Sequence, residues 1–192
     1  MHKRLRLAVK ILFLGGTGNI SAECASLLKE RGHQILVLSR GQTPVPPEYI
    51  SIRADRNDTS AIRAALQGKQ PDVVLNFLGY ELKNVEDDFE LFSGAVSQYI
   101  FISSATVYSK PPERLPITEE APLGNAWWEY AQKKLTCEQW LLQQQRTSGF
   151  PVTIVRPSHT YSKSWVPNAV SSANYNLARR LEQNKSSRRN RP

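Results

Sequence analysis

The sequence lacks the usual features of membrane proteins, disulfide-bonded proteins and metalloproteins. It contains no apolar run of about eighteen residues, the length that a membrane-spanning helix needs. Only two of the 192 residues are cysteines, Cys24 and Cys137, and both fall in predicted helices far apart in the sequence. The three histidines are also scattered, so no cluster has the spacing of zinc ligands. We therefore expect a cytoplasmic chain with free thiols and without metal or membrane contact.

Acidic residues are fewer than basic ones, which gives a formal net charge of +8 at pH 7. The excess lies at the two ends. Four basic residues precede Ile11, and six follow Pro167 against Glu182 alone. The stretch between them is close to neutral. Basic ends leave nucleic-acid binding open as a function, but solvated termini are the simpler explanation.

A glycine-rich turn stands between an apolar strand and a helix near the start of the chain. The strand is predicted at 7–14 and the helix at 21–31, joined by Gly15-Gly16-Thr17-Gly18-Asn19-Ile20-Ser21. Gly15 can take the positive φ of a tight turn, and Gly18 leaves room for a pyrophosphate. The helix that follows directs its N–H groups and positive dipole end at such an anion. This context favours a dinucleotide site, although glycine turns also serve simple strand–helix connections.

Further strands and helices alternate along the chain. Strands are predicted at 34–39, 49–54, 73–78, 99–104 and 152–157, and helices at 59–66, 86–96 and from 127 or 128 to 146. This alternation predicts an α/β protein with a Rossmann-type, doubly wound parallel sheet and helices on both faces. Four prolines make 110–126 a long loop over the site.

Candidate ligand-binding residues recur where strands end, which is the edge at which parallel sheets bind ligands. Arg40 follows the second strand with no carboxylate near it. Its guanidinium favours the 2′-phosphate of NADP over the ribose hydroxyls of NAD, and an ordinary surface arginine is the alternative. Asp55 stands where an adenine amino group could bind, and Gly79, Ser104 and Pro157 end later strands.

A tyrosine and a lysine share one face of a predicted helix. Tyr130 and Lys134 are four residues apart, and this spacing places both side chains on the same side. An ammonium near a phenol favours the phenolate, which can act as a base toward a hydroxyl, while the phenol can act as an acid toward a carbonyl. Ser104 could hold the same substrate oxygen. The alternative is that Tyr130 packs and Lys134 is solvated.

Together these motifs carry a resemblance that covers about residues 7–167. The glycine turn, Ser103-Ser104-Ala105-Thr106-Val107-Tyr108, the Tyr130/Lys134 pair and Arg156-Pro157 resemble the extended short-chain dehydrogenase/reductase family. The subgroup that they resemble most is the NAD-dependent epimerase/dehydratase proteins. This resemblance implies hydride transfer between the cofactor nicotinamide and a carbon of a nucleotide-linked sugar.

The resemblance also implies a role for each candidate residue. Tyr130 would be the general base, Lys134 would bind the nicotinamide ribose and favour the phenolate, and Ser104 would orient the substrate oxygen. The implied cofactor-binding residues are Gly15, Thr17, Gly18, Asn19, Ile20, Arg40, Asp55, Arg56, Phe77, Leu78, Gly79, Ser103 and Pro157. Either NAD or NADP would bind there, with NADP favoured by Arg40.

The sequence departs from the family pattern in three places. Ser21 replaces the third glycine of the turn, Arg40 replaces an acidic residue, and the substrate-binding lobe is largely missing. We expect a cofactor-binding domain over 1–167 and a basic, disordered tail over 168–192. The expected partner is a nucleotide-sugar, and a homodimer stays open. The alternative function is a non-catalytic, dinucleotide-binding or RNA-binding relative of the family.

Overall fold

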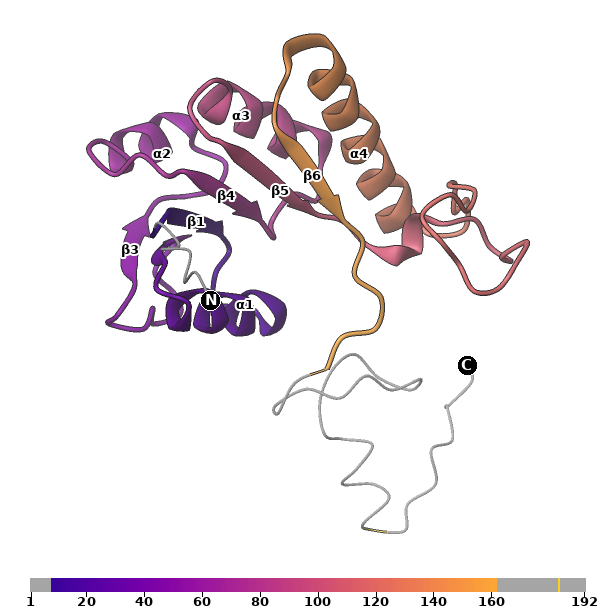
Figure 1. The fold of residues 1–192 in the computed structure, drawn as a ribbon, viewed down its shortest axis with the longest axis horizontal. Coiled ribbons are helices and arrows are strands. Elements are labelled where there is room, and N and C mark those ends of the chain that lie inside the picture. Colours follow the sequence, from indigo (N-terminus) through magenta and orange to yellow (C-terminus); the bar gives the residue numbers. More distant parts are fainter. Residues whose placement is uncertain (1–7, 162–182, 184–192) are drawn as a thin grey trace, which may run out of the picture. The chain divides into compact units, whose positions relative to one another are not determined.

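A six-stranded parallel sheet organises the chain in the computed structural model, which describes residues 8–161 and 183 (Figure 1). The strands are β1 (Lys10–Leu14), β2 (Gln34–Ser39), β3 (Ile50–Arg53), β4 (Val73–Asn76), β5 (Gln98–Ile102) and β6 (Val152–Val155). They lie in the order β3-β2-β1-β4-β5-β6, and every neighbouring pair is parallel. The helices are α1 (Asn19–Glu30), α2 (Thr59–Ala65), α3 (Leu82–Phe92) and α4 (Glu129–Ser148), with a short 3-10 turn η1 (Ala105–Val107).

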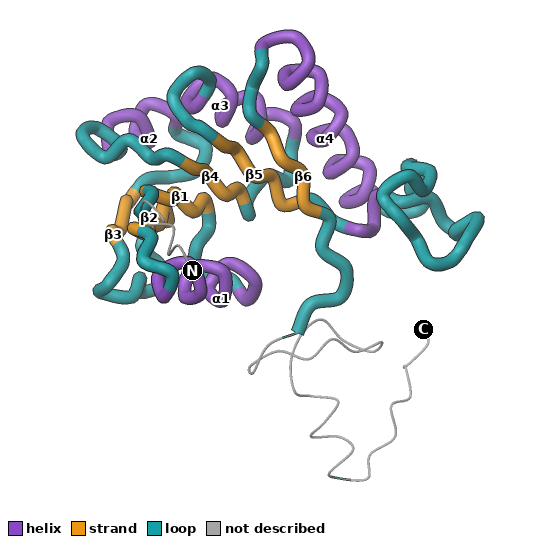
Figure 2. The backbone as a smooth tube through the Cα atoms, in the orientation of Figure 1, coloured by secondary structure: helices purple, strands orange, loops and turns teal. Residues whose placement is uncertain are grey.

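Helices cover both faces of this sheet, as the sequence predicts. Figure 2 shows α1 on one face and α2, α3 and α4 on the other. Alternate residues of β1 serve the two layers: Ile11 and Phe13 pack with Ala25 of α1, whereas Leu12 and Leu14 belong to the core beneath the other three helices. Both layers are therefore built from near-continuous apolar strands, which is typical of a sheet buried on both sides.

The order of the strands reverses at β1. The chain runs outward from β1 to β2 and β3, then returns to place β4 on the other side of β1. The crossovers after β1 and β4 therefore leave in opposite directions, and a crevice opens at the carboxyl ends of these strands. The glycine turn follows β1 at this point. The switch in strand order thus places the turn where α/β sheets bind ligands.

Some boundaries differ from the sequence-based prediction. The third helix begins at Leu82 rather than at 86, because the Asn84 side chain accepts the N–H groups of Tyr80 and Glu81 and caps it. It ends at Phe92, just before Gly94, whose φ is +70°. The expected domain boundary at 167/168 and all of 168–192 except Gln183 lie outside the described residues. Within the described part of the chain, no helix is long and apolar enough to cross a bilayer.

Candidate functional site: a dinucleotide cleft beside a Tyr–Lys pair

The first two glycines of the turn are required by the protein's own packing. Gly15 has a φ of +86°, and a Cβ on it would lie 2.6 Å from Cγ of Leu78. A Cβ on Gly16 would lie 2.8 Å from Cγ1 of Val37, in the neighbouring strand. Both distances are shorter than real contacts allow. The turn is therefore folded tightly onto the ends of β2 and β4.

Gly18 is different, because the fold itself does not require a glycine there. Its φ is −85°, and an added Cβ would meet only the Ser21 hydroxyl, at 3.4 Å. Gly18 is exposed at the N-terminus of α1, where the first amides of a helix have no intrahelical partner. Open space in front of free N–H groups and a positive dipole end suits an anion. The residues present therefore fit the pyrophosphate of a dinucleotide.

Ser21, which replaces the third glycine, helps to shape this helix end. Its side chain is buried, accepts the Gly18 N–H at 2.9 Å and donates to the Gly18 carbonyl at 3.2 Å. The hydroxyl therefore closes the turn onto the first residues of α1. At this position the serine supplies a hydrogen-bonded cap to the helix.

A cleft of about 180 Å³ opens beside the turn. Five of the predicted cofactor-binding residues line it, together with five neighbours: Gly15, Thr17, Arg40, Arg56 and Leu78, then Leu38, Ser39, Gln42, Thr43 and Ala54. This lining contains two guanidinium groups, three hydroxyl groups and no carboxylate. Its polarity suits a ligand part that carries negative charge.

Other predicted cofactor-binding residues lie near this cleft without lining it. Asp55 is exposed, and its carboxylate accepts the Asn57 N–H at 2.8 Å within the turn after β3. Phe77 stacks on Phe13, with ring centroids 5.8 Å apart, and so belongs to the packing beside α1. Asn19 and Ile20 form the first turn of α1. The cofactor-binding roles of these residues stay predictions.

Lys134 is one of the most buried side chains in the described structure, with 1% exposure. Its ammonium donates to the carbonyl oxygens of Gly79 and Ile102, each at 2.7 Å. These carbonyls belong to the segments that leave β4 and β5. Burial lowers the Lys134 pKa to about 8. The alternative of a solvated Lys134 is therefore wrong, and the lysine ties together two strand ends.

Tyr130 lies in the first turn of α4, half-buried among other aromatic rings. Its ring centroid is 5.2 Å from that of Trp128 and 6.4 Å from that of Tyr80, and the Lys134 ammonium is 5.9 Å from it. The Tyr130 pKa is raised, first by burial and then by Tyr80, while the Ser104 hydroxyl acts in the opposite direction. The causes of this pKa shift are burial, Tyr80 and Ser104, and the role of Lys134 in favouring a phenolate stays a prediction.

The two serines after β5 differ in their surroundings. The Ser104 hydroxyl accepts the Thr106 N–H at 3.3 Å and the Thr106 hydroxyl at 2.9 Å, which begins η1. The Ser103 hydroxyl is buried and has no hydrogen-bond partner among the described residues. The Pro157 carbonyl accepts the Ala105 N–H at 2.9 Å and so joins the end of β6 to η1. The Lys134 ammonium reaches the Ile102 carbonyl at the carboxyl end of β5, and the Ser104 hydroxyl is close enough to Tyr130 to affect the pKa of its phenol.

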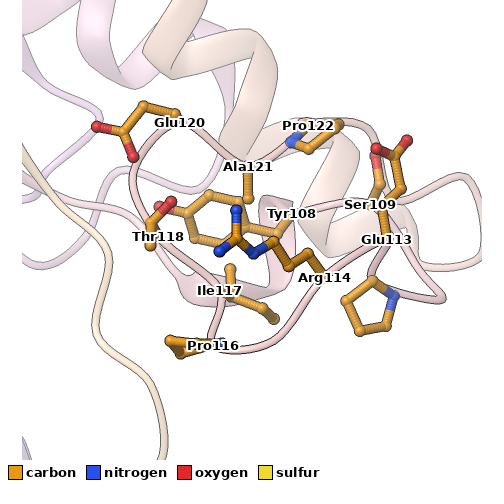
Figure 3. A pocket seen from close by; sticks show the side chains of 11 residues that line it. Tyr108, Ser109, Glu113, Arg114, Pro116, Ile117, Thr118, Glu120, Ala121 and Pro122 are labelled. Carbon is orange, nitrogen blue, oxygen red and sulfur yellow. The ribbon is translucent and has the colours of Figure 1, made fainter.

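The proline-rich loop forms a cavity of its own. Its volume is about 510 Å³, and all of its lining residues fall between Tyr108 and Pro122 (Figure 3). None of the residues predicted for the site lines it. Tyr108 connects the loop to the sheet, because its hydroxyl accepts Nη1 of Arg156 at 3.1 Å. The loop is therefore folded around a cavity of its own, and its position over the site stays a prediction.

Sequence reasoning missed several residues that shape the site. Gly16 packs so closely against Val37 that an added Cβ would clash with it. The rings of Trp128 and Tyr80 lie beside Tyr130. Asn76 and Asp88 form a buried polar group below the cleft. A signal for Asn76 exists in the sequence, since it interrupts an apolar strand. Nothing in the spacing of Asp88 marks it, because Asp87 beside it is just as acidic.

Comparison with known proteins places these features in context. The model of the NAD dependent epimerase/dehydratase family matches residues 11–189. The UDP-glucose 4-epimerase of Lactobacillus helveticus is 28% identical over 169 residues, which are 77% of this chain and 51% of that protein. The chloroplast stem-loop binding protein of 41 kDa b from Arabidopsis thaliana is 31% identical over 126 residues, 58% of this chain and 33% of that protein. The chain thus spans about a third to a half of these relatives.

Solved structures show the same fold. The UDP-glucose 4-epimerase of Brucella ovis, in complex with NAD, matches with a TM-score of 0.69 at 21% identity, over 78% of this chain and 51% of that one. The Bordetella bronchiseptica enzyme WbmH, in complex with NAD⁺, matches with a TM-score of 0.71 at 18% identity, over 93% of this chain and 64% of that one. At these identities the likeness concerns the fold.

Proposed function

The chain belongs to the NAD-dependent epimerase/dehydratase family, and from this premise we propose that it binds NADP or NAD at the glycine turn and takes part in hydride transfer on a nucleotide-linked sugar. When bound, the nicotinamide ring of the cofactor supplies the hydride or accepts it. The observation that carries the proposal is the empty space at Gly18. The fold does not need a glycine there, whereas a pyrophosphate against the N-terminus of α1 does.

The lining of the cleft favours a cofactor with a 2′-phosphate. Arg40 is exposed at its rim beside Ser39 and Thr43, and no carboxylate among the lining residues is available for ribose hydroxyls. A guanidinium matches a phosphate through two parallel N–H donors, and hydroxyl groups add further donors. We therefore assign NADP as the preferred cofactor and Arg40 as the residue that selects it.

The proton transfer would fall to Tyr130. The phenol is protonated at neutral pH and can therefore donate its proton to a carbonyl oxygen. Ser104 stands at the same edge and would hold that oxygen. Lys134 would act by fixing the ends of β4 and β5 around the nicotinamide half of the cofactor, through its bonds to the Gly79 and Ile102 carbonyls. The proposal includes the division of the chain into a cofactor-binding domain over 1–167 and a tail over 168–192.

A Gly18→Val variant tests the cofactor site directly. The side chain would fill the space proposed for the pyrophosphate, so affinity for NADPH should fall at least about tenfold, while the fold survives because the contact with Ser21 is loose. Titration by cofactor fluorescence measures the affinity, and circular dichroism checks the fold. Ser26→Val, on the exposed side of the same helix, is the matched control. Equal affinity in the two variants would refute the phosphate cradle.

A second candidate function is RNA binding without catalysis. It is favoured by the match to a chloroplast protein described as stem-loop binding and by the basic residues at both ends of the sequence. Retention of a labelled RNA hairpin on a filter, with and without saturating NADPH, separates the two functions. Competition between them would place both ligands at the cleft. Tight hairpin binding that is insensitive to salt would argue against a simple basic-end effect.

A further inference from the structure

A buried polar network lies beneath the cofactor cleft, and its centre is Asp88 of α3. The Asp88 side chain has no exposure. One carboxylate oxygen, Oδ2, accepts from Nδ2 of Asn76 at 2.5 Å and from the Tyr99 hydroxyl at 2.5 Å. The other, Oδ1, lies 2.8 Å from Nη2 of Arg56. A single carboxylate thus contacts groups from β4, from β5 and from the turn after β3.

Two of these partners control segments that line the cleft. Arg56 lines it directly, and its turn follows β3. Asn76 ends β4, and its Oδ1 accepts the N–H of Leu78, another lining residue, at 2.7 Å. Leu78 in turn packs against Gly15 of the glycine turn. Asp88 therefore contacts the lining residue Arg56 directly and reaches the lining residue Leu78 through Asn76, although these two lining residues are 22 positions apart in the sequence.

The network extends to the rest of the turn after β4. Nη2 of Arg56 also donates to the Asn84 carbonyl at 2.5 Å. The Asn84 side chain accepts the N–H groups of Tyr80 and Glu81, each at 3.1 Å. The backbone from 78 to 81 is thus held by Asn76 at one end and by Asn84 at the other, and Asp88 or its partner Arg56 contacts both asparagines.

We propose that Asp88 is a positioning residue for the dinucleotide cleft, which it shapes by tying the turn after β3 to the turn after β4. The proposal rests on the proposed cofactor function, because it concerns the same cleft. Asp88 itself does not reach the ligand. It acts through Arg56 and through Asn76, whose bond to Leu78 sets the depth of the cleft beside Gly15.

Stability alone does not account for a carboxylate at this position. Burial raises the Asp88 pKa to about 6, against the opposing effects of Arg56 and the two hydrogen bonds, so the charge is kept there at a cost. Apolar residues of similar volume often replace a buried ion pair without loss of stability. A residue that only packed α3 against the sheet would not need the charge. A residue that holds two turns in register does, because hydrogen bonds and an ion pair are directional.

The first test compares two neighbouring carboxylates. Asp88→Asn keeps the shape and removes the charge, which leaves Arg56 without its counter-charge. Asp87→Asn is the matched control, because Asp87 is also buried on α3 but its ion-pair partner among the described residues is the exposed ammonium of Lys83. Affinity for NAD⁺ at pH 8 should fall about tenfold in the first variant, the scale of a charge-assisted contact. It should change less than about twofold in the second, with both proteins folded by near-ultraviolet circular dichroism.

The second test uses pH, to which a merely structural contact would not respond in this way. The groups that face Asp88 are Arg56, Asn76, Tyr99 and its neighbour Asp87. Tyr99 keeps its proton throughout, because its pKa is raised well above 10. Wild-type affinity for NAD⁺ should therefore fall about tenfold between pH 8 and pH 5. The Asp87→Asn protein should follow the wild type, and the Asp88→Asn protein should stay flat. NAD⁺ is the probe because a 2′-phosphate titrates near pH 6 itself.

The third test needs no cofactor. Amide hydrogen exchange at Leu78 should become at least about tenfold faster in Asp88→Asn and stay unchanged in Asp87→Asn. If the wild type binds neither NAD⁺ nor NADP⁺, the proposed function is refuted and the exchange result alone decides the role of Asp88. If Asp88→Asn does not fold, Tyr99→Phe removes one bond to Oδ2 and should still speed exchange at Leu78. Equal affinity, pH profile and Leu78 exchange in the two Asn variants would overturn the proposal.

Discussion

The buried ammonium of Lys134 gives a prediction that depends on neither cofactor nor substrate. Desolvation lowers its pKa from 10.5 to about 8 in the folded protein. The unfolded chain therefore binds this proton more tightly, so the free energy of unfolding should rise with pH as the folded group loses its charge. The difference between these two pKa values corresponds to about 3 kcal/mol between pH 7 and pH 10.5. Below pH 8 the folded protein carries the cost of a buried cation.

The perturbation that isolates this effect is Lys134→Met, with Lys133→Met as its matched control. Lys133 is the adjacent residue of α4, but hydrogen bonds to Glu81 and Glu129 raise its pKa to about 12. It stays protonated in the folded and unfolded states through most of the same pH range. Urea denaturation of the three proteins from pH 7 to pH 10.5 gives their free energies of unfolding.

The expected result is a difference between wild type and Lys134→Met that grows by about 3 kcal/mol in favour of the wild type as the pH rises. The difference between wild type and Lys133→Met should stay nearly constant over that range. A constant difference for Lys134 as well would mean that its ammonium is not buried against the Gly79 and Ile102 carbonyls. The proposed bracing of the two strand ends would then be wrong.

Three further predictions concern the cleft and the residues beside it. Arg40→Ala should weaken NADPH binding about 10- to 100-fold and NADH binding hardly at all, the scale of a charge-assisted contact in fluorescence titrations; equal losses would make Arg40 an ordinary surface residue. Tyr130→Phe should leave the NADPH dissociation constant unchanged and lower the rate on any nucleotide-sugar that the wild type converts by about 10²- to 10⁴-fold; an unchanged rate would exclude Tyr130 as the acid. Gly16→Ala should destabilise the fold by about 1–3 kcal/mol in urea because its Cβ meets Val37, whereas Gly18→Ala should cost less; the reverse order would contradict the packing of the turn.

The sequence by itself determined the fold class. Period and composition identify the strands of the described residues. Most of them are short apolar runs bounded by polar or glycine residues and buried on both faces, whereas β3 alternates apolar and polar residues and buries only Ile52. The alternation with helices then restricts the possible topologies of the sheet, since connections between parallel strands are right-handed. The glycine turn and the i, i+4 pair of Tyr130 and Lys134 could be found for the same reason. The residues of each motif are close together in the sequence, so their spacing can be identified without the structure.

Only the tertiary structure decided what surrounds these residues. The lowered pKa of Lys134 follows from burial, and its ammonium lies over the rings of Tyr80 and Phe101, which come from other parts of the chain. The raised pKa of Tyr130 follows from burial and then from Tyr80. The role of Asp88 depends on the approach of β4, β5 and the turn after β3, and the sequence does not distinguish it from Asp87. The pattern of residue types predicts in which helix or strand a side chain stands. Its protonation state and its hydrogen-bond partners depend on neighbours in space, because desolvation and hydrogen-bond geometry are set by the folded contacts.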